Sequence, residues 1–283
     1  MIRLLVTGSS GYLGSQFIKE YAEKYCISRF SLQSQSSKYI DFEGLDAILH
    51  CAGIVHQGQK VSSAKYNQVN VKYPVDLAKL AKANGVNQFV FISSVSVYGP
   101  MEYIDEESDC NPNSKYGQSK LKAENELLEL NDDQFTVSIL RIPMIYGPQA
   151  PGNIRSAIKL VNYLPIIPLG NINNRRSFIS IRNLVYSIDW VLNCRKEGIF
   201  LLADDETIST SSLISSIIDG VGKSRLLLDS GVIRLVIRLL APSVYKKLWG
   251  NLVINCRVSK ELLGLDFPDD VKAGLADMWQ LKQ

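Results

Sequence analysis

A tyrosine and a lysine stand four residues apart in Ser114-Lys-Tyr-Gly-Gln-Ser-Lys120, at the start of a helical pattern. Residues at this spacing share one face of a helix, so Tyr116 and Lys120 would lie side by side. A phenol titrates at about pH 10, and a nearby ammonium favours its ionised form, so the pair suits proton transfer at neutral pH. An exposed helix carries such pairs by chance as well, so the spacing alone leaves both interpretations open.

Hydroxyl side chains follow an apolar run further upstream. The stretch Phe91-Ile-Ser-Ser-Val-Ser-Val-Tyr-Gly99 places Ser94 and Ser96 just past the end of an expected central strand. Open parallel sheets bind their ligands at the carboxyl ends of their strands. We therefore expect Ser94 and Ser96 to lie at the ligand-binding edge of the sheet.

Three glycines, at positions 8, 11 and 14, directly follow the apolar run 2–6. One explanation is a tight turn without a ligand, since glycine adopts positive φ at no steric cost. The other is a phosphate cradle, in which the backbone approaches a pyrophosphate and the next helix points its positive N-terminus at the anion. The tyrosine, lysine and serine downstream favour the cradle.

The elements that must position these residues alternate between strand and helix. We expect strands over 2–7, 26–32, 46–51, 88–93 and 135–141, a short strand over 38–41, and helices over 12–24, 63–84 and 115–130. This alternation predicts an α/β fold of Rossmann type, with a doubly wound parallel sheet and a smaller C-terminal lobe. We expect a dinucleotide-binding domain over 1–150, its sheet completed by parts of 175–205, and a mostly substrate-binding lobe over 151–283.

Composition narrows the function classes. A net charge of +3 without a concentrated basic run gives no indication of nucleic-acid binding. Five cysteines without a CxxC pair favour a reducing compartment over a disulfide framework, and we expect no metal site. We see no export signal and no membrane span, so we expect a cytoplasmic protein.

One late segment, 231–241, is strongly apolar but carries Arg234 and Arg238 one helical turn apart and stops at Pro242. It is too short and too charged to cross a bilayer. We expect a helix with a basic edge that packs on its own domain; the alternative is docking at a membrane surface.

Taken together, the glycine turn, the serines and the tyrosine–lysine pair resemble the short-chain dehydrogenase/reductase family, in its extended epimerase/dehydratase branch that acts on nucleotide sugars. Further matching stretches are Leu49-His-Cys-Ala-Gly53, the Asn70-containing Gln-Val-Asn-Val, and Leu140-Arg-Ile-Pro-Met-Ile-Tyr-Gly-Pro148. The resemblance covers most of the chain. It implies that Ser94 and Tyr116 hold the sugar oxygen that is oxidised or reduced. It also implies that Lys120 binds the nicotinamide ribose and lowers the pKa of Tyr116.

The resemblance further implies a bound NAD or NADP. Its expected contacts are Gly8, Ser10, Gly11, Tyr12, Leu13, Gly14, Asp41, Ala52, Tyr116, Lys120 and Pro143. An acidic residue about 20 positions beyond the glycines would bind the ribose 2′-hydroxyl of NAD. Residues 26–38 contain none, whereas Arg29 and Lys38 offer charge to a 2′-phosphate, so NADPH is slightly favoured. Asp41 sits where relatives contact adenine.

The residues that the serine motif lacks narrow the possible reactions. Dehydratases of this branch carry Asp-Glu directly after the serine that corresponds to Ser94, and this chain has Val95 and Ser96 instead. That leaves 4-epimerisation and reduction of a 4-keto group. Stretches 151–185 and 246–268 resemble bacterial polysaccharide enzymes that reduce a UDP-linked 4-keto-6-deoxy-N-acetylhexosamine. We expect that reaction, with a UDP-sugar 4-epimerase as the alternative and a non-catalytic dinucleotide sensor as a distant one.

The resemblance also implies the remaining contacts. Substrate would meet Ser94, Ser96, Asn153 and Arg176, the last at the nucleotide diphosphate unless it is simply a solvated arginine. Met144 stands where UDP-galactose epimerases commonly have an asparagine. His50 is expected in the core, and His56 is a candidate for the pocket wall. A homodimer through 63–84 and 115–130 is expected from relatives.

Overall fold

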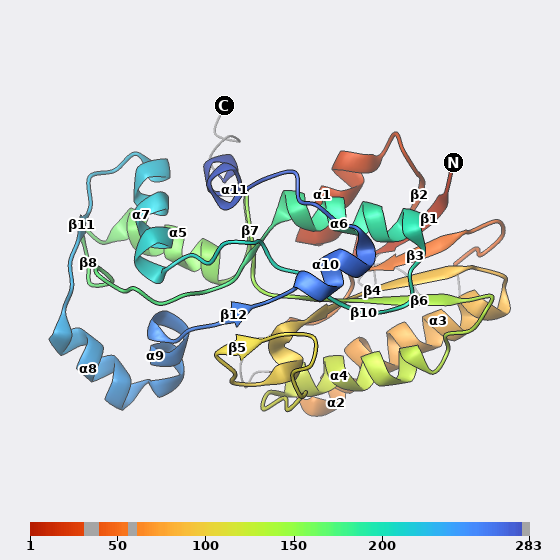
Figure 1. The fold of residues 1–283 in the computed structure, drawn as a ribbon, viewed down its shortest axis with the longest axis horizontal. Helices are drawn as coiled ribbons and strands as arrows, with labels where there is room; N and C mark the ends of the chain where they lie inside the picture. Colours follow the sequence, from red (N-terminus) through yellow and green to blue (C-terminus); the bar gives the residue numbers. More distant parts are fainter. Residues whose placement is uncertain (31–39, 56–60, 279–283) are drawn as a thin grey trace.

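The computed structural model describes residues 1–30, 40–55 and 61–278. Six parallel strands form one central sheet, in the spatial order β10-β6-β4-β3-β1-β2 (Figure 1). The strands are β1 (Arg3–Thr7), β2 (Cys26–Phe30), β3 (Ala47–His50), β4 (Gln88–Ser94), β6 (Thr136–Ile142) and β10 (Gly198–Leu201). From β1 the chain goes first to β2 on one side and then to β3 on the other, and at such a reversal a crevice forms that can take a ligand.

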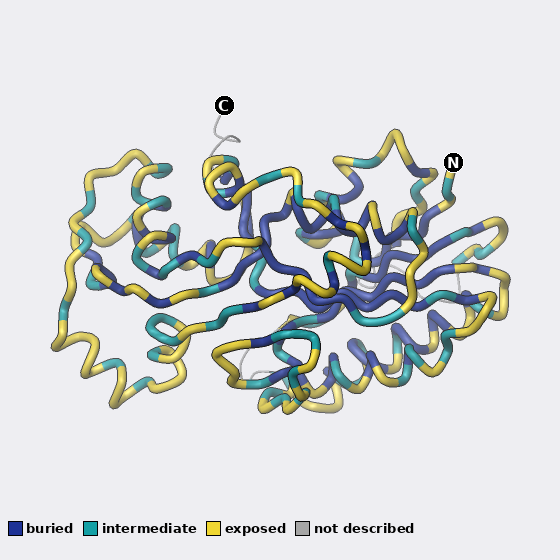
Figure 2. The backbone as a smooth tube through the Cα atoms, in the orientation of Figure 1, coloured by how far each residue is buried: buried dark blue, intermediate teal, exposed yellow. Residues whose placement is uncertain are grey.

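Helices cover both faces of this sheet, as the predicted Rossmann-type fold requires (Figure 1). On one face lie α1 (Tyr12–Tyr21) and α6 (Ile181–Cys194), which share an apolar core with Leu4 and Val6. On the other face lie α3 (Tyr73–Ala83) and α4 (Lys115–Leu128), whose core includes Leu5. Successive residues of β1 therefore serve opposite layers, so Leu4, Leu5 and Val6 are all apolar, and Figure 2 shows the strands as the buried centre of the molecule.

Element ends differ from the expected ones in several places. The helix expected over 12–24 ends at Tyr21. The helix expected over 63–84 consists of α2 (Ser63–Tyr66), a π-helical turn η3 (Asn67–Lys72) and α3. β2 ends at Phe30 within the described chain, and residues 31–32 lie outside it. Of the short strand expected over 38–41, only 40 and 41 are described, and they form no strand because neither pairs with β1 or β2.

A further apolar cluster lies beyond the two that cover the faces of the sheet. Its helices are α5 (Asn153–Tyr163), α7 (Thr210–Val221) and α11 (Val271–Asp277). Short strand pairs join the parts of the chain around it: β8 (Ile166–Ile167) with β11 (Leu226–Leu227), β7 (Ile145–Tyr146) with β9 (Ile179–Ser180), and β5 (Tyr103–Ile104) with β12 (Val253–Ile254). Three further helices lie between β11 and α11 in the chain: α8 (Gly231–Leu240), α9 (Pro242–Trp249) and α10 (Arg257–Leu263). In the part of the chain that the structure describes, no helix has both the length and the apolar character needed to cross a bilayer.

A buried ion pair ties α4 to the sheet. Glu124 of α4 is fully buried and accepts hydrogen bonds from Nε and Nη2 of Arg141 on β6, the Nη2 bond at 2.7 Å. The hydroxyl of Ser93 on β4 also donates to Glu124, and Arg141 Nη1 donates to the Tyr98 hydroxyl at 3.0 Å. Buried charges are costly unless they are paired and hydrogen-bonded, so this cluster holds α4 in one position against β4 and β6.

We expect Glu124→Gln to lower the free energy of unfolding by about 3–5 kcal/mol, because it leaves the Arg141 guanidinium buried without a counter-charge. Urea titration measures the change. Replacing both residues by methionine should recover much of the loss. The matched control is Glu126→Gln, which breaks an exposed pair with Lys122 on the same helix and should cost less than about 1 kcal/mol. Equal costs for Glu124 and Glu126 would contradict the role of the buried pair.

Candidate active site

The expected site residues gather at the carboxyl edge of the sheet. Gly8 follows β1, Ala52 follows β3, and Pro143 follows β6, while Ser94 ends β4. A Cβ on Gly8 would lie 2.7 Å from the Ala52 nitrogen, so these two strand ends are in direct contact. Lys120 reaches the same edge from α4, because its Nζ donates to the Ile92 carbonyl at 2.8 Å. Residues far apart in sequence thus line one edge.

The side chains of Ser94 and Tyr116 are close enough for the serine to lower the pKa of the phenol. Ser94 Oγ donates to the Ser96 hydroxyl at 3.1 Å and accepts from its backbone N–H at 3.2 Å. Gly117 makes this possible, since a Cβ at that position would collide with the Ser96 carbonyl, and only its absence lets α4 begin so close to the serines. Sequence reasoning identified the tyrosine but missed the role of the glycine beside it.

Burial raises the pKa of Tyr116 to about 12, although Ser94 lowers it in part. This differs from the expectation that Lys120 lowers the pKa of the phenol. The reason is geometric: the Lys120 ammonium is directed at the Ile92 carbonyl and lies 4.2 Å from the centre of the Phe91 ring. At neutral pH Tyr116 is therefore a protonated phenol, which can donate a hydrogen bond and a proton.

Lys120 is 5 % exposed, and burial lowers the pKa of its ammonium to about 8. The carboxylate of Glu124, one helical turn further along α4, acts in the opposite direction and raises the pKa of Lys120. The buried pair that anchors α4 thus also helps to keep Lys120 charged at neutral pH. No spacing rule in the sequence pointed to Glu124.

A buried asparagine braces the other side of this edge. Asn70 lies in the π-helical turn, accepts from the Ile54 N–H at 2.8 Å, and donates to the Ile54 carbonyl and to the Ser119 hydroxyl. It joins the segment after β3 to the helix that carries the tyrosine. The sequence signal was the stretch Gln-Val-Asn-Val, which matches the family, and π-turns often occur at functional sites.

His50 is buried in the core as expected, and its Nδ1 lies 2.9 Å from the Thr7 hydroxyl. Its Nε2 has no hydrogen-bond partner within the described chain, so only half of the ring's polar capacity is satisfied. Burial lowers the pKa of His50 to about 3, which keeps the imidazole neutral. His56 lies outside the described residues.

The glycine turn fits a pyrophosphate. Gly8 has φ +68° and packs on Ala52, and a Cβ on Gly14 would lie 2.5 Å from the Gly8 carbonyl, so both are required by packing alone. Gly11 is different, since its φ is ordinary and a Cβ there would meet only the Gly8 carbonyl, at 3.1 Å. It caps α1 without any side-chain hydrogen bond, so the helix N-terminus faces the turn with its N–H groups available to an anion.

Other cofactor candidates contribute in different ways. Leu13 and Gly14 are buried in the first turn of α1, whereas Ser10 is exposed before it. Tyr12 packs between the apolar cluster of α1 and α6 and the cluster of α5, α7 and α11. Its hydroxyl is buried without a hydrogen-bond partner in the described chain. What it presents to the turn is therefore its backbone N–H. Pro143 is buried directly after β6.

Three expected contacts lie apart from the serine and tyrosine. Asp41 is exposed before β3, where its carboxylate accepts from the Glu43 N–H, and Asn153 is exposed at the start of α5. Arg176 is not the solvated arginine of the alternative interpretation, because its Nη1 donates to the Gly250 carbonyl at 2.9 Å and burial lowers its pKa. Within the described residues, no hydrogen bond or ion pair joins these three to Ser94 or Tyr116.

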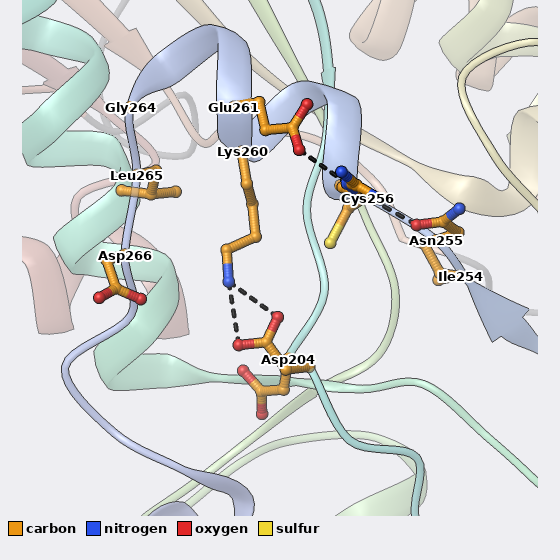
Figure 3. A pocket seen from close by; sticks show the side chains of 11 residues that line it. Asp204, Ile254, Asn255, Cys256, Lys260, Glu261, Gly264, Leu265 and Asp266 are labelled. Carbon is orange, nitrogen blue, oxygen red and sulfur yellow. Dashed lines mark hydrogen bonds and ion pairs between the residues drawn. The ribbon is translucent and has the colours of Figure 1, made fainter.

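A separate hollow of about 440 Å³ lies between α10 and the segment after β10 (Figure 3). Most of its polar side chains are already partnered. Lys260 pairs with Asp205 at 2.7 Å, Arg257 with Glu261 at 2.7 Å, and Asp204 accepts from the Tyr146 hydroxyl at 2.7 Å. Its wall contains neither the serine, the tyrosine nor the lysine of the sheet edge, so the catalytic chemistry does not belong there.

We expect Gly11→Val to fold but to bind a dinucleotide at least tenfold more weakly, because a branched side chain would occupy the space in front of the helix N-terminus. Quenching of protein fluorescence by NADPH and NADH measures the affinity. The control Gly231→Val, at a position where a Cβ meets nothing within 4 Å, should bind as the unaltered protein does. Unchanged affinity in a folded Gly11→Val protein would make the glycine turn a plain turn.

Loss of the Lys120 proton should produce a falling limb on the basic side of the pH–rate profile. We expect kcat/KM to fall as the pH rises through about 8, because the ammonium is charged below its pKa and loses its proton above it. In Lys120→Met the rate should be low and this limb absent. Lys122→Met, at an exposed position on the same helix, should keep both rate and limb. Persistence of the limb in Lys120→Met would assign it to another group.

Comparison with known proteins agrees with this geometry. Residues 4–203 match the description of the NAD dependent epimerase/dehydratase family. The UDP-glucose 4-epimerase of Vibrio cholerae is 27 % identical over 306 residues, covering 96 % of this chain and 92 % of the relative. The UDP-glucuronic acid 4-epimerase of Bacillus cereus in complex with NAD superposes with a TM-score of 0.79 at 19 % identity, covering 98 % of this chain and 97 % of that one. The dTDP-4-dehydrorhamnose reductase of Bacillus anthracis in complex with NADP gives 0.81 at 18 % identity, with both chains covered in full.

The structural likenesses establish the Rossmann-type fold, and the family match establishes an enzyme of the short-chain dehydrogenase/reductase type that depends on NAD or NADP. Its relatives include both epimerases and reductases of nucleotide sugars. With the glycine turn, the serine–tyrosine contact and the buried lysine at one sheet edge, the chain belongs to the NAD-dependent epimerase/dehydratase family.

Proposed function

We propose that the protein reduces the 4-keto group of a UDP-linked 4-keto-6-deoxy-N-acetylhexosamine, with a modest preference for NADPH. The observation that carries this proposal is the buried, protonated Tyr116 beside the Ser94 hydroxyl at the sheet edge. Two hydroxyl groups at one point suit the reduction of a carbonyl, where negative charge develops on a single oxygen.

The chain's own residues divide the work. Ser94 and Tyr116 donate hydrogen bonds to the keto oxygen and orient the sugar, and Tyr116 passes its proton to that oxygen as it becomes an alkoxide. Lys120 contributes a positive charge behind the tyrosine, held by Ile92 and supported by Glu124. The reduced nicotinamide, when bound along Gly8–Gly14 and Lys120, supplies the hydride.

Reduction is favoured over the other reactions of the family by what the site offers. Dehydration needs an acid and a base next to the serine, and the side chains there are a buried valine and a hydroxyl, Val95 and Ser96. Epimerisation couples an oxidation to a reduction on the same sugar, so the site must keep its cofactor bound between the two steps. It also needs a site in which the keto sugar can rotate. Met144 packs on the apolar cluster of the second lobe instead of offering an amide to the sugar.

The cofactor preference rests on the end of β2. The residues at that end carry no carboxylate as far as the described chain extends, and Arg29 is exposed there. A guanidinium suits the 2′-phosphate of NADP, whereas NAD is usually held at this point by a carboxylate. Asp41 remains a candidate contact for the adenine.

Substrate contacts beyond the reacting carbon also belong to the proposal. Arg176, held in place by Gly250, is proposed to bind the nucleotide diphosphate, and Asn153 to contact the substrate from the start of α5. Ser96 adds a hydroxyl beside Ser94. We further propose a homodimer through α3 and α4, and a UDP-sugar substrate, with the division between a cofactor domain and a substrate lobe at residue 150.

The second candidate is a UDP-sugar 4-epimerase, which the name of the Vibrio cholerae relative favours. The two reactions differ in what happens to the cofactor. A reductase consumes one reduced dinucleotide for each sugar, whereas an epimerase returns the hydride to the same molecule and needs no added cofactor.

The deciding experiment gives the purified protein a UDP-4-keto-6-deoxy-N-acetylhexosamine with NADPH or NADH and follows absorbance and product together. We expect one NADPH oxidised per sugar reduced, slower turnover with NADH, and at least a hundredfold loss in Tyr116→Phe. The control Tyr163→Phe removes an exposed hydroxyl and should change nothing. Interconversion of UDP-glucose and UDP-galactose without added cofactor, by protein that purifies with bound NAD, would establish the epimerase instead.

A further inference from the structure

The helix α8 does not pack on its own domain, contrary to expectation. Nine of its ten residues are exposed, and only Ile237 is half-buried. Its most exposed apolar side chains form a stripe with the spacing of one helix face, which we call the α8 stripe: Val232, Leu235, Val236, Leu239 and Leu240, at 75, 56, 47, 71 and 82 % exposure. In Figures 1 and 2, α8 and α9 form an exposed corner of the molecule, beyond α5 and α7 of the second lobe.

The arginine side of α8 faces its own neighbour. The Arg238 guanidinium lies 5.8 Å from the ring of Tyr245 on α9, and that ring stacks on Trp249 at 5.3 Å. Arg238 and α9 therefore lie along one flank of the stripe, and the side chains of the stripe are exposed to solvent. A contiguous apolar stripe of this kind, left exposed, normally marks a surface on which something binds.

The charge around the stripe has one sign. From Ser230 to Lys260 the sequence contains six lysines and arginines and no aspartate or glutamate. Two of the six, Arg257 and Lys260, are paired with acids elsewhere. In the described part of the chain the other four form no ion pair: Arg234, Arg238, Lys246 and Lys247.

We propose that α8 and α9 dock the enzyme on an anionic membrane surface. Helices that lie in the lipid interface combine an exposed apolar stripe with lysines and arginines on their flanks, and often an aromatic side chain at headgroup depth. The α8 stripe, the four unpaired cations, and Tyr245 with Trp249 supply these features on one short helix pair. The helix lies on the membrane and does not cross it.

The uniform charge argues against a second copy as the occupant. A twofold contact through the α8 stripe would bring together two copies of α8 and α9, each carrying four cations without an ion-pair partner in the described chain. The segment has no acidic side chain to compensate them, and like charges across an interface are unfavourable. Anionic lipid headgroups provide the missing negative charge. The surface is separate from α3 and α4, where the dimer is proposed.

Sedimentation with lipid vesicles tests the proposal on the full chain. We expect the protein to sediment with vesicles in which about a third of the lipid is phosphatidylglycerol, to stay in solution with pure phosphatidylcholine, and to be released by salt. Leu235→Ser with Leu239→Ser should lower the partition coefficient at least about tenfold. Arg234→Gln with Lys247→Gln should also lower it, and should weaken its dependence on salt.

The matched control is Val258→Ser with Leu262→Ser, which changes two apolar side chains of α10 that are 48 and 55 % exposed. It should leave vesicle binding unchanged. Unaltered near-ultraviolet circular dichroism and NADPH affinity show that each variant is folded, and Val232→Ser alone provides a milder second variant. Absence of binding to both kinds of vesicle would overturn the proposal. So would light scattering in which the unaltered protein is a dimer and the Leu235, Leu239 variant a monomer.

Discussion

The buried pair of Glu124 and Arg141 is the interaction on which the geometry of the site depends. Ser94 is presented by the sheet edge and Tyr116 and Lys120 by α4, and the relative position of these two elements decides whether the three side chains meet. The pair fixes α4 to β6, and Ser93 extends the contact to β4, one residue before the serine of the site. A charged link is directional, so it resists sliding of the helix more than apolar packing alone would.

The same link has an electrostatic role. An ammonium that is taken out of water tends to lose its proton, and Lys120 is almost fully buried. The carboxylate one turn away restores part of the preference for the charged form. Structure and chemistry are therefore coupled: the group that positions α4 also adjusts the charge of the lysine that the helix carries. Few arrangements could serve both needs with a single side chain.

Local spacing was sufficient to predict the parts of the site that are local. Tyr116 and Lys120 are one helical turn apart, and the glycines lie between one strand and one helix, so sequence reasoning identified both groups and the fold. It could not identify partners brought together from distant positions, such as Glu124 with Arg141, or Asn70 with Ile54. The pKa of Tyr116 was predicted in the wrong direction because burial and the direction of the Lys120 ammonium depend on tertiary packing. The exposure of α8 was missed for a related reason: an apolar sequence shows that a face needs a partner, but not which partner.

The π-helical turn between α2 and α3 restricts how this chain can change length. Tyr66 before the turn and Val71 and Val75 after its start are all buried, so each faces the core in its present rotation about the helix axis. Adding or removing one residue rotates everything beyond it by about 100°. Such an insertion or deletion would carry Asn70 away from Ile54 or turn the apolar face of α3 toward water. We therefore expect a change in length in this stretch to disturb the site more than one in the exposed connections of the second lobe.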